Sequence, residues 1–286
     1  MYAITGISGQ VGGAVARALL ADGQSVRAVV RDADKGRAWA ERGCEVALAT
    51  ITDAEAMAAA FAGTEGVFLM TPPNFDPEPG FPEIHAMRDA ALAAIEAARP
   101  GKVVFLSTVG AQASEFNLLT NASIMEAGLR AASAPMALLR PGWFMENAVW
   151  DLPAARAGAI VSFLQPADHA VPMIATADIG AVAAALLGET WTGVRVVELE
   201  AATRCSANDI AAGFARALGH PVGVELPPRD GWEALFRAQG ANHPLPRMRM
   251  LDGFNQGWID FEGGDAEKRV GTTPLDAVLA QLVARG

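Results

Sequence analysis

Three glycines near the N-terminus stand three residues apart in the stretch TGISGQVGG, residues 5–13. Residues 2–5 predict a short strand, and residues 11–20 have the apolar periodicity of a helix. A glycine turn between a strand and a helix lets the backbone approach a phosphate, and the helix N-terminus offers free N–H groups to the anion. The motif indicates either a dinucleotide pyrophosphate site or a turn whose glycines serve packing alone. The residues expected at the phosphates are Gly6, Ser8, Gly9, Gln10 and Val11.

Two cations follow the next strand-like run, SVRAVV at residues 25–30. A strand ending in Asp or Glu would bind the adenosine ribose and select NAD, but this strand leads into Arg31. Arg31 can stack on adenine and bind a 2′-phosphate, with Lys35 as a second cation. Asp32 could still reach a ribose, and a solvated helix start with ordinary surface charges is the alternative. We therefore expect NADP(H), with NAD(H) as the second choice.

The usual proton relay of a short-chain dehydrogenase is missing from this chain. That relay is a Tyr-x-x-x-Lys pair, in which the lysine lowers the pKa of the tyrosine and the tyrosine transfers the carbonyl proton. The chain has one tyrosine, Tyr2, in the first predicted strand, and no lysine follows it by four residues. The sequence therefore predicts a site without this acid.

Strand-like and helical segments alternate through the first half of the chain. The helical patterns cover residues 11–22, 33–42, 53–63, 82–98 and 121–133. The apolar, strand-like runs lie at residues 25–30, 44–49, 66–70, 102–107 and 136–140. This repeat predicts an α/β fold, a doubly wound parallel sheet of the Rossmann type with helices on both faces. In that context the glycine motif is read as a cofactor turn.

The regular alternation loosens after Pro141. We assign residues 1–141 to a dinucleotide-binding Rossmann core and residues 142–286 to a mixed α/β segment. That segment is expected to extend the sheet by two late strands and to form a smaller, mostly helical C-terminal substrate lobe over the cofactor. The strands are expected at residues 194–200 and 222–226, and the helices at residues 177–188, 206–218, 229–239 and 274–285.

Composition narrows the classes of partner. The 286 residues carry a net charge of −10, which argues against a nucleic-acid partner because phosphate contacts need clustered Lys and Arg. Two distant cysteines and four scattered histidines predict no metal site and no disulfide framework, which fits a reducing cytoplasm. We expect no membrane contact, because the chain has neither a signal-like start nor a long apolar run.

Several segments resemble the NmrA-like, atypical short-chain dehydrogenase family. Within it, the sequence is most similar to bacterial NAD(P)H:quinone oxidoreductases and triphenylmethane-dye reductases. The likeness covers nearly the whole chain. The segments that carry it are TGxxGxxG at 5–12, VRAVVRDADK at 26–35, LMTPP at 69–73, FLSTVGA at 105–111, ALLRPGWFMENAV at 137–149, DIGAVAAALL at 178–187 and DIAAGFARALGHPV at 209–222.

The resemblance implies positions for further site residues. It places the loop of Met70, Thr71 and Pro72 along the cofactor ribose. It also matches Glu126 and Arg140 to a helix glutamate and an arginine that stand a fixed interval apart in family members, and these we expect to form a buried ion pair. In that register Leu118 and Ala122 occupy the places where typical relatives carry the tyrosine and the lysine of the relay.

The substrate end is expected at the ends of two later strands. Ser107 and Thr108 follow the strand nearest the nicotinamide in this fold, where they orient the ring or the substrate, or else cap the next segment. Trp143, Phe144 and Asn147 are expected to frame the substrate, although both aromatics suit a core position equally well. The aromatic and Met-rich residues of 232–261 suit a substrate pocket, a homodimer interface or a helical core.

Together these features predict an NAD(P)H-dependent reductase that acts on a small molecule. Without a protein acid, hydride transfer suits a quinone-like or other electron-poor conjugated acceptor, whose reduced form takes its proton from water. The alternative is a non-catalytic NADP(H)-binding redox sensor or regulatory protein, because the resembled family contains both.

Overall fold

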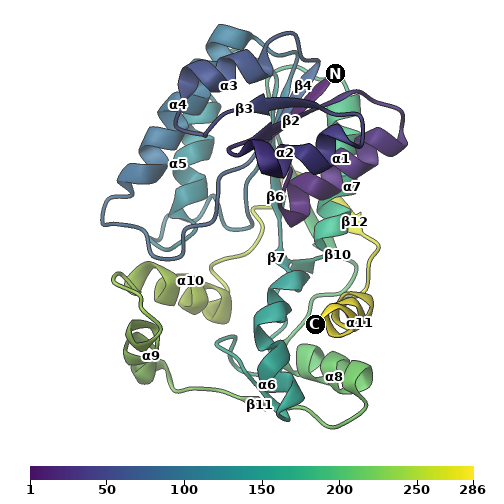
Figure 1. Cartoon of the computed structure of the whole chain (residues 1–286). Helices are drawn as coiled ribbons and strands as arrows, with labels where there is room; N and C mark the ends of the chain where they lie inside the picture. Colours follow the sequence, from purple (N-terminus) through teal and green to yellow (C-terminus); the bar gives the residue numbers. More distant parts are fainter.

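The computed structural model describes all residues from 1 to 286 and contains a central sheet of eight parallel strands (Figure 1). The strand order is β12-β10-β6-β5-β4-β1-β2-β3, which is the doubly wound order with two further strands at one edge. This confirms the expected fold class. The strands are β1 (Tyr2–Ile4), β2 (Val26–Val30), β3 (Glu45–Leu48), β4 (Gly66–Leu69), β5 (Val103–Leu106), β6 (Met136–Pro141), β10 (Val194–Ala201) and β12 (Glu267–Gly271).

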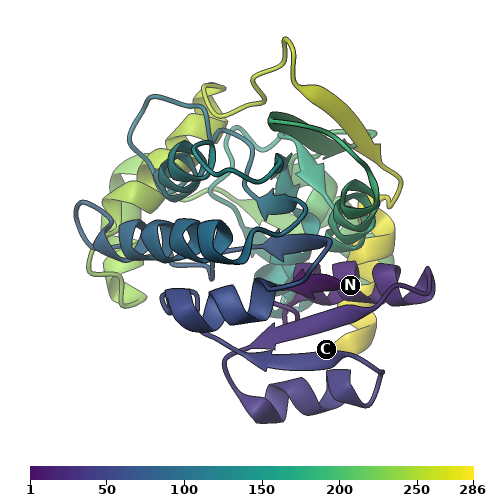
Figure 2. The same cartoon turned by 90° about the horizontal axis from the view of Figure 1, so that it is seen from above.

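Helices cover both faces of this sheet (Figure 2). The central strands β4 and β5 are apolar and buried at every residue, because both of their faces meet helices. One apolar layer joins the sheet to α1 (Gln10–Ala21), α2 (Ala33–Ala40) and α7 (Thr176–Gly188). The opposite layer joins it to α3 (Ala54–Phe61), α4 (Pro82–Ala98) and α5 (Thr120–Leu129).

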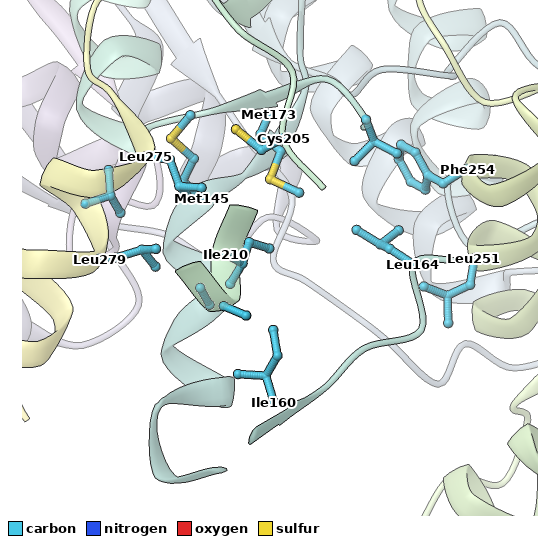
Figure 3. Close-up of a cluster of buried hydrophobic side chains, with 14 of the residues drawn as sticks. Met145, Ile160, Leu164, Met173, Cys205, Ile210, Leu251, Phe254, Leu275 and Leu279 are labelled. Atoms are coloured by element: carbon cyan, nitrogen blue, oxygen red, sulfur yellow. The ribbon is translucent and has the colours of Figure 1, made fainter. Parts of the chain in front are cut away.

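A smaller, mostly helical lobe lies beyond the C-terminal end of β6. The lobe has an apolar cluster of its own, and Figure 3 shows Met145, Ile210, Phe254 and Leu279 as members of it. The helices of the lobe are η1 (Met145–Asp151), α6 (Leu152–Arg156), α8 (Ala207–Leu218), η2 (Arg229–Gly231), α9 (Trp232–Ala238), α10 (Leu245–Gln256) and α11 (Leu275–Arg285). Two small parallel sheets pair β7 (Trp143–Phe144) with β9 (Met173–Ile174) and β8 (Ala159–Val161) with β11 (Gly223–Glu225).

The expectation for one of the two late strands is wrong. The strand predicted at residues 222–226 is β11, and it pairs with β8 inside the lobe instead of extending the central sheet. The second late strand of the central sheet is β12, which pairs with β10. Its sequence, EKRVG, alternates exposed and half-buried residues at an edge, so it lacks the continuous apolar run of the inner strands.

Three global features complete the description. None of the helices has both the length and the apolar character needed to cross a bilayer. No three His, Cys, Asp or Glu side chains come together in a way that could hold a metal ion. Cys44 and Cys205 are free, buried thiols, and burial raises the pKa of Cys205 to about 11.

Candidate functional site

The glycine turn joins β1 to α1 and leaves the helix N-terminus open. Gly6 has a left-handed backbone (φ +60°), and a Cβ there would come within 2.8 Å of Cγ of Met70. Gly12 lies where α1 crosses β1, because a Cβ would come within 2.8 Å of the Thr5 carbonyl oxygen. Gly9 caps α1 without any side-chain hydrogen bond, so the first N–H groups of the helix have no partner in the helix.

The predicted phosphate residues lie together at this turn. Gly6, Ser8, Gly9 and Gln10 are exposed, whereas the side chain of Val11 is buried. Val11 can therefore contribute only its backbone N–H to an anion. The turn thus has exposed backbone, no carboxylate in the first turn of α1 and free N–H donors, which is the arrangement that binds a phosphate.

Thr5 fixes the loop after β4 against the glycine turn. Its buried hydroxyl donates to the carbonyl oxygen of Phe68 (3.1 Å) and accepts from the backbone N–H of Met70 (2.9 Å). The structure therefore brings Met70 beside Gly6, and Thr71 and Pro72 follow directly. These three residues were predicted on the resemblance alone.

Two exposed cations follow β2 at the position expected for the adenosine end of a dinucleotide. Arg31 and Lys35 form no ion pair and no side-chain hydrogen bond in the structure. Their neighbours are already engaged, because the carboxylate of Asp32 accepts from the N–H of Asp34 (2.8 Å) and Arg37 pairs with Asp34 (2.6 Å). The Asp32 carboxylate is thus a helix cap, and Arg31 and Lys35 remain free for an anionic ligand.

Ser107 belongs to a buried ion-pair network. Its hydroxyl donates to Oε1 of Glu126 (2.6 Å), and the guanidinium of Arg140 binds the same carboxylate through Nε (2.8 Å) and Nη2 (2.6 Å). All three side chains are more than 90% buried. The expected pair of Glu126 and Arg140 is present, and Ser107 is its third member.

A second carboxylate completes the surroundings of Arg140. Nη1 of Arg140 donates to Glu262 (2.6 Å), which comes from the segment before β12. Burial alone would lower the pKa of Arg140, but the hydrogen bonds and charges of Glu126 and Glu262 outweigh it and raise that pKa. The Ser107 proton is therefore committed to a carboxylate that a permanent cation holds in place, and Ser107 offers only lone pairs to a ligand.

Thr108 and the aromatic residues beyond β6 lie outside the buried network of Ser107. Thr108 is half-buried, and its carbonyl oxygen accepts from the N–H of Ala111 (3.2 Å) at the start of the next turn. The half-buried ring of Trp143 meets Phe254 edge to face, with centroids 5.3 Å apart. Phe144 packs against the apolar layer between the sheet and the helices α1, α2 and α7, and Asn147 is half-buried on η1. Trp143 and Phe144 thus contribute to packing, and their role in framing a substrate stays a prediction.

The positions of the missing relay are apolar. Leu118 is 5% exposed and belongs to the apolar cluster of the lobe, and Ala122 is half-buried on α5. The only tyrosine, Tyr2, is 6% exposed at the start of β1, whereas the glycine turn follows the end of that strand. No tyrosine hydroxyl lies at the predicted substrate end.

A hollow of about 530 Å³ adjoins the loop after β4. Thr71 and Pro72 line it, together with the rest of that loop, the start of α4 and Asn121 of α5. Asp76 anchors the loop, because its carboxylate accepts from the backbone N–H groups of Asn242 and His243 in the lobe. Burial would raise the pKa of Asp76, but these hydrogen bonds lower it overall.

Sequence reasoning missed one aromatic pair that joins the loop after β4 to η1. Phe75 of the loop and Trp150 of η1 are 48% and 63% exposed, and their rings meet edge to face with centroids 5.8 Å apart. Neither residue belongs to a periodic pattern, so only the folded chain brings them together.

The sequence model of the NmrA-like family matches residues 2–243. The chain belongs to the NmrA-like family. It is 28% identical over 251 residues to quinone oxidoreductase 2 of Escherichia coli, which covers 87% of this chain and 85% of that protein. It is also 28% identical over 246 residues to (4-alkanoyl-5-oxo-2,5-dihydrofuran-3-yl)methyl phosphate reductase of Streptomyces griseus, which covers 86% and 83%. The structure of Citrobacter sp. triphenylmethane reductase superposes with a TM-score of 0.83 over 99% of both chains, at 21% identity.

Proposed function

We propose that this protein is an NADPH-dependent oxidoreductase that transfers hydride to an electron-poor conjugated small molecule such as a quinone. The observation that carries the proposal is the pairing of an open glycine turn after β1 with two unpaired cations after β2. These are the two anion sites that a dinucleotide with a 2′-phosphate needs. The relative from Escherichia coli is named as a quinone oxidoreductase, which supports the acceptor class.

In this proposal three groups of predicted residues bind the cofactor. The N–H groups of Gln10, Val11 and Gly12 would hold the pyrophosphate, since that of Gly9 donates to the Gly6 carbonyl oxygen, and Arg31 and Lys35 would hold the 2′-phosphate. Met70, Thr71 and Pro72 would lie along the ribose. NADPH supplies the hydride when it is bound.

No protein acid is required in this proposal. Hydride addition to a quinone gives an anion whose negative charge lies on oxygen. This anion is stable in water, so solvent can provide the proton. Ser107 cannot supply that proton, because its own hydrogen is committed to Glu126. Its lone pairs instead suit an N–H or O–H donor of the cofactor or the acceptor, which makes Ser107 an orienting group.

The apolar positions Leu118 and Ala122 favour a second function, a cofactor-binding redox sensor without turnover. Both functions require the same phosphate sites and differ only in whether an acceptor is reduced. The sensor remains the alternative for this chain.

A single experiment separates the two. NADPH binding is measured by fluorescence titration, and the absorbance of NADPH is then followed with a panel of quinones, dyes and enones. Oxidation of NADPH with at least one acceptor supports the reductase. Tight NADPH binding without any turnover supports the sensor, and no NADPH binding overturns both.

A further inference from the structure

The most exposed large apolar side chain of the molecule is Trp150, and it lies against a second exposed aromatic ring. That ring belongs to Phe75, with the centroids 5.8 Å apart and an interplanar angle of 89°. Phe75 comes from the loop that carries Thr71 and Pro72, and Trp150 comes from η1, the helix that carries Asn147. The pair therefore joins the segment predicted to hold the cofactor to the segment predicted to frame the substrate.

The backbone on both sides of Phe75 is anchored. The side-chain amide of Asn74 donates to Glu83 at the start of α4 (2.7 Å). The carboxylate of Asp76 accepts from the lobe at the N–H of Asn242 (2.9 Å) and from that of His243. Phe75 is thus presented at a fixed place by flanking residues, although its own ring is half exposed to water.

The backbone around Trp150 is fixed in a similar way. Met145 and Ala148 of η1 are 2% and 4% exposed, and both belong to the apolar cluster of the lobe. η1 is therefore held on the lobe by its buried side, and Trp150 projects from the other side. Two rings on anchored backbone, one from each half of the molecule, form a preorganised pair.

The pair can separate at small cost. An edge-to-face contact between aromatic rings contributes little beyond the area it buries, so the two side chains can rotate apart on their anchored backbone. Because the two rings are perpendicular, a flat ring system that enters between them would stack on the face of one ring and meet the edge of the other, and it would cover apolar surface that is now exposed. A single small ring covers less of that surface than a fused ring system does.

We propose that Phe75 and Trp150 form an aromatic clamp that holds the flat ring system of the acceptor and favours fused rings over single rings. This inference rests on the proposed function and deepens it by naming the acceptor class and two residues that select it. Phe75 and Trp150 belong neither to the glycine turn nor to the buried network of Ser107.

The test compares Phe75→Ala, Trp150→Ala and the double variant on a naphthoquinone and a benzoquinone. We expect each single variant to lower kcat/KM for the naphthoquinone about tenfold, mainly through KM, and to leave the benzoquinone within about twofold. The double variant should lose less than the product of the two single losses, because the residues act as one unit. Val270→Ala on β12, where the side chain is 61% exposed, is the control and should change neither quinone.

Binding provides a measurement that does not depend on turnover. Naphthoquinone is titrated into the NADP⁺-loaded protein while tryptophan emission is followed, and the quenching is compared with that of Trp150→Phe. The clamp predicts that Trp150→Phe retains affinity and loses most of the quenching, whereas Trp150→Ala loses affinity. Unchanged naphthoquinone affinity in Trp150→Ala, or equal losses on both quinones, overturns the clamp. A wild-type protein that binds the naphthoquinone without reducing it overturns the proposed function and leaves the clamp standing.

Discussion

Gly9 is the residue at which the phosphate site can be tested with least damage to the fold. Its φ of −91° suits any residue, and a Cβ would meet only the Gly6 carbonyl oxygen at 3.2 Å. Aspartate is a favourable N-cap, so Gly9→Asp should fold, but its carboxylate would occupy and repel the phosphate position. We expect NADPH affinity to fall by at least about a hundredfold, the equivalent of 2.7 kcal/mol. Gly9→Ala is the steric control, and an unchanged NADPH titration in Gly9→Asp would place the phosphate site elsewhere.

The two free cations after β2 decide the choice between NADPH and NADH. Replacing Arg31 and Lys35 by Ala should weaken NADPH by about 1.5–3 kcal/mol, the cost of lost charge-assisted hydrogen bonds, with a much smaller effect on NADH. Arg37→Ala is the matched control on the same helix, because Arg37 is already paired with Asp34. Calorimetric titration with both cofactors gives the comparison. Equal weakening of NADPH and NADH would show that these side chains do not contact the 2′-phosphate.

Ser107 provides a residue-scale test of the absent acid. Because its proton is committed to Glu126, Ser107→Ala should remove only orientation and should lower kcat by no more than about tenfold, or 1.4 kcal/mol. The maximal rate of the wild type should also vary little between about pH 6 and pH 8. Steady-state rates at saturating NADPH over this range provide the measurement. A sharp bell-shaped profile, or complete loss of activity in Ser107→Ala, would reveal an acid that the structure does not identify.

Among the elements, those with a strong local signal could be predicted and those defined by pairing could not. The helix at residues 82–98 has the predicted bounds, and the helix predicted at residues 206–218 begins with a reciprocal capping box between Ser206 and Asp209. The strand β12 was missed because an edge strand is recognised by its partner β10 and not by an apolar run of its own. The contact of Phe75 with Trp150 was missed for the same reason, since irregular segments bring the two rings together.

The crossing of α1 over β1 makes a prediction at the scale of elements. A methyl group at Gly12 would collide with the carbonyl groups of Gly6 and Thr5, which are backbone atoms that cannot rotate away. Gly12→Ala should therefore lower the free energy of unfolding by about 1–3 kcal/mol and weaken NADPH binding with it, because the turn must open. Gly188→Ala at the end of α7, where a Cβ meets nothing within 4 Å, is the control. Denaturant unfolding measures both variants, and equal stability for the two would contradict the close packing.

At the scale of the molecule, polar contacts fasten the lobe to the sheet at several points. Arg140 of β6 binds Glu262, and the side chain of Gln112 donates to the carbonyl oxygen of Asp260 (2.8 Å). Asp76 in the loop after β4 adds a further contact, because its carboxylate accepts from the N–H of Asn242 in the lobe. The segment before β12 therefore does more than complete the sheet, because it also holds the buried network that fixes Ser107. This explains why the site depends on residues that lie more than a hundred positions apart.

Asp151 at the end of η1 gives the whole fold a dependence on pH. Its carboxyl group forms no hydrogen bond or ion pair, and burial raises its pKa from 3.8 to about 6. The folded protein therefore binds this proton more tightly than the unfolded chain does. Above the unfolded pKa the folded state is penalised, so this group makes the free energy of unfolding fall as the pH rises from about 4 to 6 and leaves it constant at higher pH.

Asp151→Asn removes this titration and keeps the shape of the side chain. The variant should gain about 2 kcal/mol more stability over the wild type at about pH 8 than at about pH 4, since a pKa shift of one unit corresponds to 1.36 kcal/mol. Urea unfolding at the two pH values measures the difference. Asp265→Asn is the control, because it neutralises an exposed, unpaired carboxylate in the loop before β12. If Asp151→Asn gained the same stability at both pH values, or no more than Asp265→Asn, the Asp151 carboxyl would be hydrated in the folded protein and its burial would have no effect on stability.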